Sequence, residues 1–334
     1  MAESSHSSTA LETDVQARRP ATRVGLSRVG VTGVEKVIRI SSAGADQLFY
    51  AELECFVDLS PEQKGAHMSR FEEVVNEAID EVVLSSALKA ETLASRIAEL
   101  VRERQGALRA EVTIAARYPE TKPAPVSGRP TQEIYTLFGS AVASATGTRR
   151  VVGVQAQGMT ACPCAQEMLT ERAAVRLQEQ GFTADEIERI FDSVPVATHN
   201  QRGIGTLYVG CPEGVEDTIE AATLLEIVEE SMSSEIYELL KRPDEAAVVE
   251  KAHRRPRFVE DCVREAIRLA VERFAPLGDA AFISSRQENL ETIHKHNVVA
   301  ERHGTLGELT RELDGGDPEI VRHTSMRDWL HGPA

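Results

Sequence analysis

The sequence predicts an α+β protein that contains two copies of one unit, each an antiparallel sheet with two helices on one face. Segments of alternating polarity come in hairpin-like pairs, and amphipathic helical segments lie between the pairs. The order strand, strand, helix, helix, strand, strand occurs twice, over residues 21–146 and 147–310, with a linker near 146–150. No dinucleotide fingerprint or P-loop is present, which argues against a Rossmann-type fold.

The first unit begins with "VEKVIRI" (34–40) and "LFYAELECFVDL" (48–59), joined by the turn-like "SSAGAD". Strict alternation in the second of these segments is typical of a half-buried strand, and the first is its hairpin partner. Apolar residues then recur at 74, 75, 78, 79, 82 and 83, which predicts an amphipathic helix. A second helix is expected around 89–105, followed by strands at 107–118 and 131–145.

The second unit repeats this order with an insertion. Strands are expected at 149–161 and 200–211, a helix at about 217–240, a helix after Pro256, and strands at 280–288 and 293–304. The helix after Pro256 is supported by a stripe of nine apolar residues between 258 and 274. The insertion, 165–198, reads as helical, and Thr183 with Glu186 forms a capping box.

Composition restricts the class of protein. The 334 residues carry 53 acidic and 37 basic side chains, a net charge of −16, and only seven of the basic residues are Lys. This acidic, Arg-rich balance favours a halophilic cytoplasm, although a GC-rich genome would also raise Arg over Lys. No basic face is evident, which disfavours nucleic-acid binding.

Targeting signals are absent from the sequence. It has no apolar run long enough for a membrane span, and its polar start is unlike a secretory signal. We therefore expect a cytoplasmic protein with a disordered tail at 1–20 and a second tail at 311–334. Five cysteines, an odd number, make a disulfide framework unlikely in this compartment.

Two of these thiols, Cys162 and Cys164, flank Pro163 in "GMTACPCAQE". Thiolate, imidazole and carboxylate are ligands for Zn²⁺ or Fe²⁺. Cys162 is expected to end one strand, His199 to begin the next, and His294 to lie on a late strand of the same unit. Such strand ends can converge on a catalytic metal. Buried structural thiols and a redox dithiol are the alternatives that the spacing leaves open.

Other polar clusters have two interpretations. His296 lies two residues from His294, so both would face one side of a strand. His67, at a helix start with Ser69 as N-cap and Lys64 and Arg70 nearby, predicts either a phosphate site or simple capping. A separate residue, Glu260, falls in the first turn of its helix, where a carboxylate also offsets the helix dipole.

Seven motifs occur in an order that resembles a known family: "QKGAHMSRF", "KPAPVSG", "CPC", "HNQR", "LLKRPDE", "FVED" and "IHKH". Together they resemble the prokaryotic type IB GTP cyclohydrolases over about residues 20–300. The long helical insertion after "CPC" resembles the archaeal branch, the MptA-type enzymes (GTP cyclohydrolase IV).

This resemblance implies two tandem tunnelling-fold (T-fold) units and a homotetramer with sites at subunit interfaces. By motif, the metal ligands would be Cys162, His199 and His294, with Glu245 as a further ligand, and Glu260 would anchor guanine. Glu291 and His296 would support the metal site or serve proton transfer. From the residues alone, Lys64, His67, Ser69 and Arg70 stay the candidates for binding substrate phosphate. The expected metal is Fe²⁺, one per subunit, with Zn²⁺ or Mn²⁺ as alternatives.

The resemblance also implies the reaction. A metal-polarised water attacks C8 of GTP, the imidazole ring opens, and formate leaves. The archaeal branch gives 7,8-dihydroneopterin 2′,3′-cyclic phosphate for pterin biosynthesis. Three alternatives stay open: a bacterial-type enzyme that yields dihydroneopterin triphosphate, a T-fold nitrile reductase, and a non-enzymatic metal or thiol module.

Overall fold

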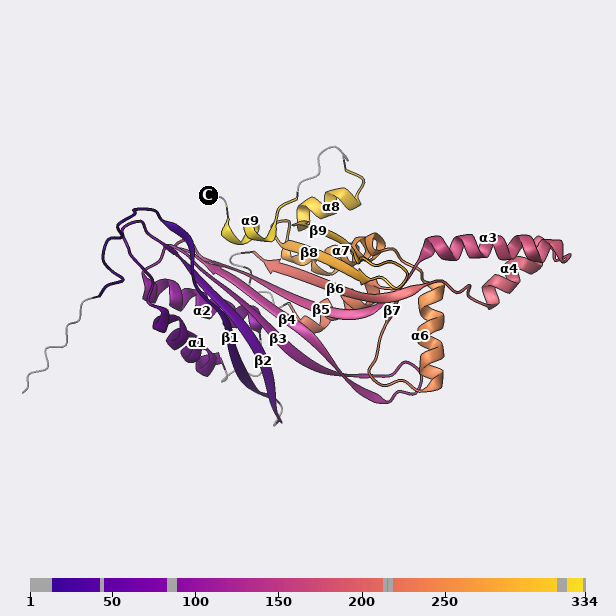
Figure 1. Cartoon of the computed structure of the whole chain (residues 1–334), viewed down its shortest axis with the longest axis horizontal. Helices are drawn as coiled ribbons and strands as arrows, with labels where there is room; N and C mark the ends of the chain where they lie inside the picture. Colours follow the sequence, from indigo (N-terminus) through magenta and orange to yellow (C-terminus); the bar gives the residue numbers. More distant parts are fainter. Residues whose placement is uncertain are drawn as a thin grey trace, which may run out of the picture.

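One antiparallel sheet runs through the whole molecule (Figure 1). The computed structural model describes residues 14–42, 45–82, 89–212, 215, 219–316 and 323–332. Within these residues the strand order is β1-β2-β3-β4-β5-β6-β8-β9, and the short β7 pairs with β5. The strands are β1 (Leu26–Ser42), β2 (Ala45–Leu59), β3 (Ala110–Pro123), β4 (Pro130–Ala143), β5 (Thr148–Ala161), β6 (Asn200–Cys211), β7 (Ser234–Glu235), β8 (Phe282–Leu290) and β9 (Val298–Thr305).

Helices follow the pairs of strands as the sequence predicts. They are α1 (Met68–Val82), α2 (Ala90–Gln105), α3 (Pro163–Glu179), α4 (Ala184–Ser193), α5 (Ala221–Ser231), α6 (Arg242–Arg254), α7 (Val259–Phe274), α8 (Leu306–Leu313) and α9 (Met326–His331), with a 3₁₀ turn, η1 (Ala275–Leu277). The α+β class with antiparallel pairing is confirmed. The segment expected to be a linker is a tight hairpin, since Ala143 pairs with Thr148 and the sheet continues across it.

The main helices cover one face of this sheet. Residues at alternate positions of β2 and β3, such as Leu53 and Ile114, pack with α1 and α2. Leu207 of β6 and Ile283 of β8 pack with α5 and α7 in the same way. The short α9 covers part of the other face, where Trp329 packs on Val151 and Phe282.

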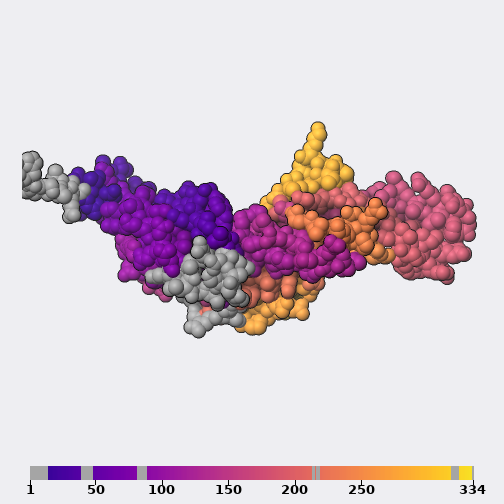
Figure 2. All heavy atoms as spheres, turned by 90° about the horizontal axis from the view of Figure 1, so that it is seen from below, coloured from indigo at the N-terminus to yellow at the C-terminus, as the bar shows by residue number. Residues whose placement is uncertain are grey.

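The insertion is a helical hairpin that projects from the end of the molecule (Figures 1 and 2). Its first helix, α3, has no buried residue, so it adds little to the core. The predicted capping box is present: Glu186 N–H donates to the Thr183 hydroxyl, and Thr183 N–H donates to the Glu186 carboxylate at 2.9 Å. None of the described helices is long and apolar enough to cross a membrane.

Several expectations for individual elements are wrong. The helix predicted at 217–240 is shorter, because α5 ends at Ser231 and β7 follows. A separate helix, α6, occupies 242–254, where Pro243 stands in the first turn and a capping arrangement at Lys241 starts the helix. The last strand starts only at Val298, so the segment 291–297 is a loop. Ser69 lies inside α1, which begins at Met68, and is not its N-cap.

Both expected tails contain residues that contact the rest of the protein. The first 13 residues of the N-terminal tail lie outside the described residues. Those that follow contact the body, because Gln16 accepts a hydrogen bond from Lys64 N–H at 3.0 Å. At the other end, Trp329 of α9 is 6% exposed and its indole N–H donates to the Ala280 carbonyl at 2.8 Å, so this segment packs against the sheet.

Candidate functional site

Cys162 and His199 lie side by side where β5 ends and β6 begins. Ala161 and Asn200 are the last partners of the β5–β6 ladder, and Cys162 N–H donates to the His199 carbonyl at 3.1 Å, one step beyond. Both side chains are half-buried. Because residues opposite each other in an antiparallel pair project to the same face, the thiol and the imidazole share one side of the sheet.

The loop before β6 is fixed from two sides, which holds His199 in place. The Thr198 hydroxyl donates to the Cys162 carbonyl at 2.9 Å. From α3, the Gln166 amide donates to the carbonyls of Val196 and His253, at 2.6 and 2.7 Å. The Nδ1 atom of the imidazole is buried and has no hydrogen-bond partner among the described residues. A buried nitrogen of this kind is free to bind a ligand.

A third strand end adds Glu291. It directly follows β8, whose last residue Leu290 pairs with Arg202 of β6. The Thr292 hydroxyl donates to the Asn200 carbonyl at 3.0 Å, so the chain still runs beside β6 at this point. The Glu291 Oε2 atom is buried, and no residue in the described part of the chain forms a hydrogen bond with it. The structure therefore brings three of the predicted residues, Cys162, His199 and Glu291, to one end of neighbouring strands.

The other predicted metal and proton-transfer residues do not join them within one chain. His294 and His296 lie in the exposed 291–297 loop, not on a strand, and their rings stack with centroids 5.3 Å apart. Glu245 is exposed in the first turn of α6, and Cys164 is exposed in that of α3. Among the described residues, no group of three or more His, Cys, Asp or Glu could hold a metal ion.

Asp244, next to Glu245, joins two of the sequence motifs. It is fully buried and accepts hydrogen bonds from Val126 N–H, Ser127 N–H and the Ser127 hydroxyl at 2.8–2.9 Å, and from Lys241 N–H at 2.9 Å. Burial alone would raise the pKa of Asp244, but the hydrogen bonds, led by Ser127 and Lys241, outweigh it and hold the pKa below its usual range. The "KPAPVSG" loop is thus fastened to the start of α6.

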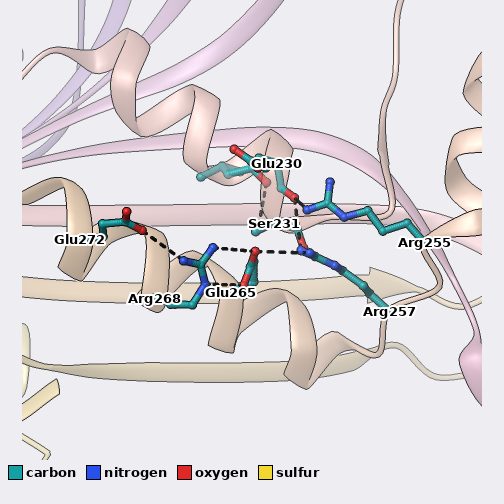
Figure 3. A network of polar contacts seen from close by, with 8 residues as sticks. Glu230, Ser231, Arg255, Arg257, Glu265, Arg268 and Glu272 are labelled. Carbon is teal, nitrogen blue, oxygen red and sulfur yellow. Dashed lines mark hydrogen bonds and ion pairs between the residues drawn. The ribbon is translucent and has the colours of Figure 1, made fainter. Parts of the chain in front are cut away.

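The start of α7 is fastened to the end of β5 by Arg257. Its N–H donates to the Ala161 carbonyl at 2.9 Å, and its guanidinium donates to the Ser231 carbonyl at 2.6 Å at the end of α5. Figure 3 shows Arg257 continuing into a chain of charges through Glu265 and Arg268. Glu260 lies in the first turn, as predicted, and is exposed at a cavity of about 420 Å³ between α7, β9 and α8.

The four predicted phosphate-binding residues lie at the opposite end of the sheet. They follow β2, whose Val57 pairs with Ala110 at the start of β3. The Arg70 guanidinium donates to the Arg104 carbonyl at 3.0 Å, and His67 Nε2 lies 3.3 Å from the Asp14 carboxylate. Within one chain, Lys64, His67, Ser69 and Arg70 are therefore remote from Cys162.

The sequence interpretation missed a buried charged cluster between the two halves. Lys122 contacts Glu229 at 2.6 Å, and both side chains are less than a fifth exposed. The Tyr135 hydroxyl donates to the same carboxylate at 3.0 Å. Burial, and then the charge of Glu229, raise the pKa of Tyr135 and also that of Glu120. A polar cavity of about 370 Å³ lies beside Tyr135 and Glu229.

It also missed two polar residues directly beside the Cys162–His199 pair. Thr160 and Gln201 pair across β5 and β6, and each has a buried side-chain oxygen that lacks a hydrogen-bond partner within the described ranges. A signal was present in the sequence. In "NQRGIGTLYVGC" the core residues Leu207 and Val209 share one face of the strand with positions 201 and 203. These earlier positions are Gln and Gly rather than apolar side chains.

Comparison with known proteins identifies the family. A model of the type I GTP cyclohydrolase folE2 family matches residues 13–300. The chain is 43% identical over 307 residues to the GTP cyclohydrolase MptA of Methanococcus aeolicus, which covers 90% of this chain and 99% of the relative. The corresponding protein of Methanocaldococcus jannaschii is 41% identical over 306 residues, with 90% and 97% covered.

Solved structures agree on the fold. The uricase of Arthrobacter globiformis superimposes with a TM-score of 0.51 at 9% identity, over 84% of this chain and 94% of the uricase. At that identity the likeness concerns the fold alone, which is the T-fold. With the family match over most of its length, the chain belongs to the type I GTP cyclohydrolases and, within them, to the MptA-type branch.

Proposed function

We propose that this chain opens the imidazole ring of GTP, releases formate and forms 7,8-dihydroneopterin 2′,3′-cyclic phosphate for pterin biosynthesis. The observation that carries the proposal is the pairing of Cys162 with His199 beside Glu291, in a chain of the GTP cyclohydrolase family. A thiolate, an imidazole and a carboxylate at one site suit hydrolysis at a metal centre.

The donor set fits a catalytic metal in part. Cys162 and the unpartnered Nδ1 of His199 would supply two ligands, and His294 and Glu245 would supply the others. We propose Fe²⁺, one per subunit, with Zn²⁺ or Mn²⁺ as ions that the same donors accept. Such an ion, when bound, lowers the pKa of water and so provides hydroxide at neutral pH.

In our proposal, the complete site takes residues from more than one copy of the chain. His294 and Glu245 are exposed on a loop and a helix, and the phosphate-binding candidates around His67 lie at the far end of the sheet. Glu260 is exposed as well. We therefore propose a homo-oligomer, a homotetramer as in the family, in which the end of one sheet meets residues of a neighbouring copy.

The cyclic phosphate is proposed because of the α3–α4 insertion and the MptA relatives. This insertion starts immediately after Cys162, so it lies beside the proposed metal ligands. In our proposal Glu291 and His296 transfer protons during ring opening. A carboxylate and an imidazole are side chains that commonly serve as general acids and bases.

Anaerobic incubation with GTP and Fe²⁺, followed by mass analysis of the product and a formate assay, tests the proposed function. We expect formate and the cyclic monophosphate in equal amounts, and no turnover of ATP. A triphosphate product would assign the chain to the bacterial-type reaction. Absence of formate would refute the proposal, and reduction of a nitrile substrate with oxidation of a nicotinamide would replace it.

The Glu260→Ala variant tests base recognition. A carboxylate accepts from both N1–H and the 2-amino group of guanine, whereas adenine has an acceptor at N1. Loss of such a charge-assisted pair costs about 1.5–3 kcal/mol, so GTP use should fall roughly tenfold or more. The metal content should not change. Unchanged GTP affinity with a lower melting temperature would mean that Glu260 only offsets the dipole of α7.

A further inference from the structure

The C-terminal helix α9 lies beyond the part of the chain that matches the family model. That match ends at residue 300, whereas α9 spans Met326–His331. The helix has a prepared place on the sheet, because a Cβ at Gly210 would lie 2.8 Å from the Trp329 ring. The indole N–H of Trp329 donates to the Ala280 carbonyl, and the Arg149 guanidinium donates to the Trp329 carbonyl. A specific docked position of this kind indicates that α9 has a role of its own.

A cavity of about 350 Å³ lies between α9 and the strands β1, β3 and β4. The polar residues that line it come from all four elements and are Arg28, Glu111, Thr113, Ser140, Arg327 and His331. The helix α9 therefore forms one wall of the cavity. The cavity borders the start of β3 and the last residues of β4, which lie at the end of the sheet opposite Cys162. It is therefore separate from the proposed metal site.

Positive side chains outnumber negative ones around this cavity. Arg28 and Arg327 line it, and the Arg109 guanidinium contacts His331 Nδ1. Glu111 is the one carboxylate among the described lining residues, and both of its oxygens are engaged. Its Oε2 atom lies 3.0 Å from Arg28 Nε, and its Oε1 atom lies 3.2 Å from His331 Nε2. Arg327 has no hydrogen-bond or ion-pair partner in the described part of the chain. Three guanidiniums against one carboxylate leave an excess of positive charge.

The imidazole of His331 responds to these charges. Burial lowers the pKa of His331, Glu111 raises it, and the three guanidiniums lower it further. The ring is therefore neutral at pH 7, and its Nδ1 atom accepts from Arg109, because a guanidinium can only donate. The nearby Asp328 is engaged by the Ser325 hydroxyl at the start of α9. A local positive excess thus persists although the chain carries a net charge of −16, and such an excess attracts anions.

The lining side chains define the chemistry of the ligand. A guanidinium donates two parallel hydrogen bonds to a phosphate group, which a chloride ion does not accept in the same way. The hydroxyls of Thr113 and Ser140, a pair across β3 and β4, lie 3.4 Å apart and can donate as well. A tetrahedral oxyanion has enough acceptor oxygens for both kinds of donor. The cavity is larger than one phosphate group, so a diphosphate or the phosphate end of a nucleotide also fits.

We propose that this cavity binds a phosphate-type oxyanion, and that the bound anion links Arg327 of α9 to Arg28 of β1. The anion offsets the excess positive charge beside His331 and holds α9 against the sheet. Inorganic phosphate, diphosphate and the phosphate group of a nucleotide share this chemistry. The proposal does not depend on the reaction assigned to the chain, because none of the residues that line the cavity belongs to the proposed active site.

The single tryptophan of the chain, Trp329, gives a direct readout, because it lies in α9. The full-length protein is titrated with inorganic phosphate, diphosphate or guanosine monophosphate, and acrylamide quenching of the Trp329 fluorescence is measured. KCl keeps the ionic strength constant, which separates specific binding from charge screening. We expect the quenching to fall and to saturate. Saturation with phosphate or diphosphate identifies the free anion as the ligand, and saturation with the monophosphate alone identifies a nucleotide. No saturation with any of the three overturns the proposal.

Matched arginine variants locate the bound anion. Arg327→Gln should weaken anion binding roughly tenfold or more, since it removes one charge-assisted contact. Without an anion its quenching should match that of the unmodified protein, because Arg327 has no partner to lose among the described residues. Arg70→Gln is the control, since it removes a guanidinium from the proposed substrate phosphate site and should leave the effect intact.

An effect that disappears in Arg70→Gln and persists in Arg327→Gln would place the anion at the substrate site and refute the proposal. Formate production plays no part in these measurements. A protein that responds to the anion but releases no formate would therefore refute the proposed function and leave the anion site in place, whereas formate release without any anion effect would do the opposite.

Discussion

The two halves of the sheet differ in the residues that face the helices. In the first half, the part of β2 and β3 that α1 and α2 cover is apolar. Its helix-facing residues are Phe49, Ala51, Leu53, Cys55, Val57, Ala110, Val112, Ile114 and Ala116. In the second half the helix-facing residues are apolar at first, such as Val154 and Leu207. Toward the end of β5 they are followed by the Gly158–Gly203 pair and then the Thr160–Gln201 pair.

This difference suits a first half that serves as scaffold and a second half that carries the candidate site. The first half buries one continuous core between its strands and α1–α2, which stabilises the fold. Over its last positions the second half has glycines and polar residues, and within the described part of the chain the buried oxygens of Thr160 and Gln201 have no hydrogen-bond partner. Such groups lower stability, so a protein keeps them where they serve a function. The duplicated unit thus supports two roles with one topology.

Two cysteines on equivalent faces offer the largest contrast. Cys55 lies in the apolar row of the first half, where burial raises the pKa of its thiol to about 12, so it stays neutral. Cys162 is half-buried beside His199. Cys162→Ala should remove bound metal and lower turnover by more than about 100-fold without unfolding the protein, because ligand loss exceeds the effect of supporting groups.

Cys55→Ala is the matched control for this prediction. It should lower stability by about 1 kcal/mol, as a small truncation in a packed core, and leave metal content and turnover intact. Metal analysis, formate assays and thermal melts of the two variants provide the measurement. Full metal content in Cys162→Ala would show that the ligand assignment is wrong.

Two glycines, one in each half, differ in the atoms that surround them. A Cβ at Gly139 of β4 would lie 2.2 Å from the backbone carbon of Ala90, at the start of α2. A Cβ at Gly203 would instead meet the Gln287 amide at 2.3 Å and the Met232 sulfur at 3.1 Å, both ends of flexible side chains. Gly139→Ala should therefore cost about 1–3 kcal/mol or more, since a helix must move.

Gly203→Ala should cost less stability but lower kcat, because the displaced side chains border the Thr160–Gln201 pair. Urea unfolding and steady-state kinetics separate the two effects. If Gly139→Ala melts like the unmodified protein, or if Gly203→Ala is the less stable of the two, the proposed difference between rigid scaffold and adaptable site does not hold.

Periodicity in the sequence was sufficient for most of the fold. The alternation at 48–59 and the helical stripes that became α1 and α7 depend on local residue order, which the sequence displays directly. The helix α6 was missed because "RPDEAAVVEKAHR" has a weak apolar stripe, and its stability depends on Asp244 and on tertiary contacts. A local sequence pattern does not show contacts with residues that are distant along the chain.

Only part of the site followed from the sequence in the same way. Cys162 and His199 could be assigned because strand ends that pair must lie together, whereas Glu291 was named only from the resemblance to the family. His294 was misplaced, since the segment around it contains enough apolar residues to resemble a strand although it forms a loop. Thr160 and Gln201 were overlooked because their significance is a missing hydrogen bond, which only the packed structure reveals.

An effect of intermediate size on the melting temperature is expected at Asp244, which lies at the junction of the two halves. Its folded-state pKa lies below the ordinary value of 3.8 because of the hydrogen bonds from Ser127, Lys241 and Val126. The ionised carboxylate therefore stabilises the fold above about pH 4, and this contribution is lost as the pH falls through the folded-state pKa. Asp244→Asn should melt lower at pH 7, on the order of 5 °C.

The gap in melting temperature between Asp244→Asn and the unmodified protein should narrow below pH 4, where the unmodified protein loses the same contribution. Exposed Glu250, which pairs with Arg254 on the same helix, gives a control, and Glu250→Gln should change little at any pH. A gap that stays constant from pH 7 to pH 3 would mean that the charge of Asp244 contributes nothing to stability.

The smallest expected effect concerns the charge on the whole surface, which both halves share. A net charge of −16 in 334 residues repels itself in the compact state, and dissolved salt screens that repulsion with a Debye length of about 10 Å at 0.1 M and 3 Å at 1 M. Individual surface ion pairs, such as Arg268 with Glu272, weaken under the same conditions. Because acidic residues outnumber basic ones, repulsion exceeds these pairwise attractions. The melting temperature should therefore rise by a few degrees from dilute buffer to molar KCl, and a flat or falling curve would remove the case for a halophilic protein.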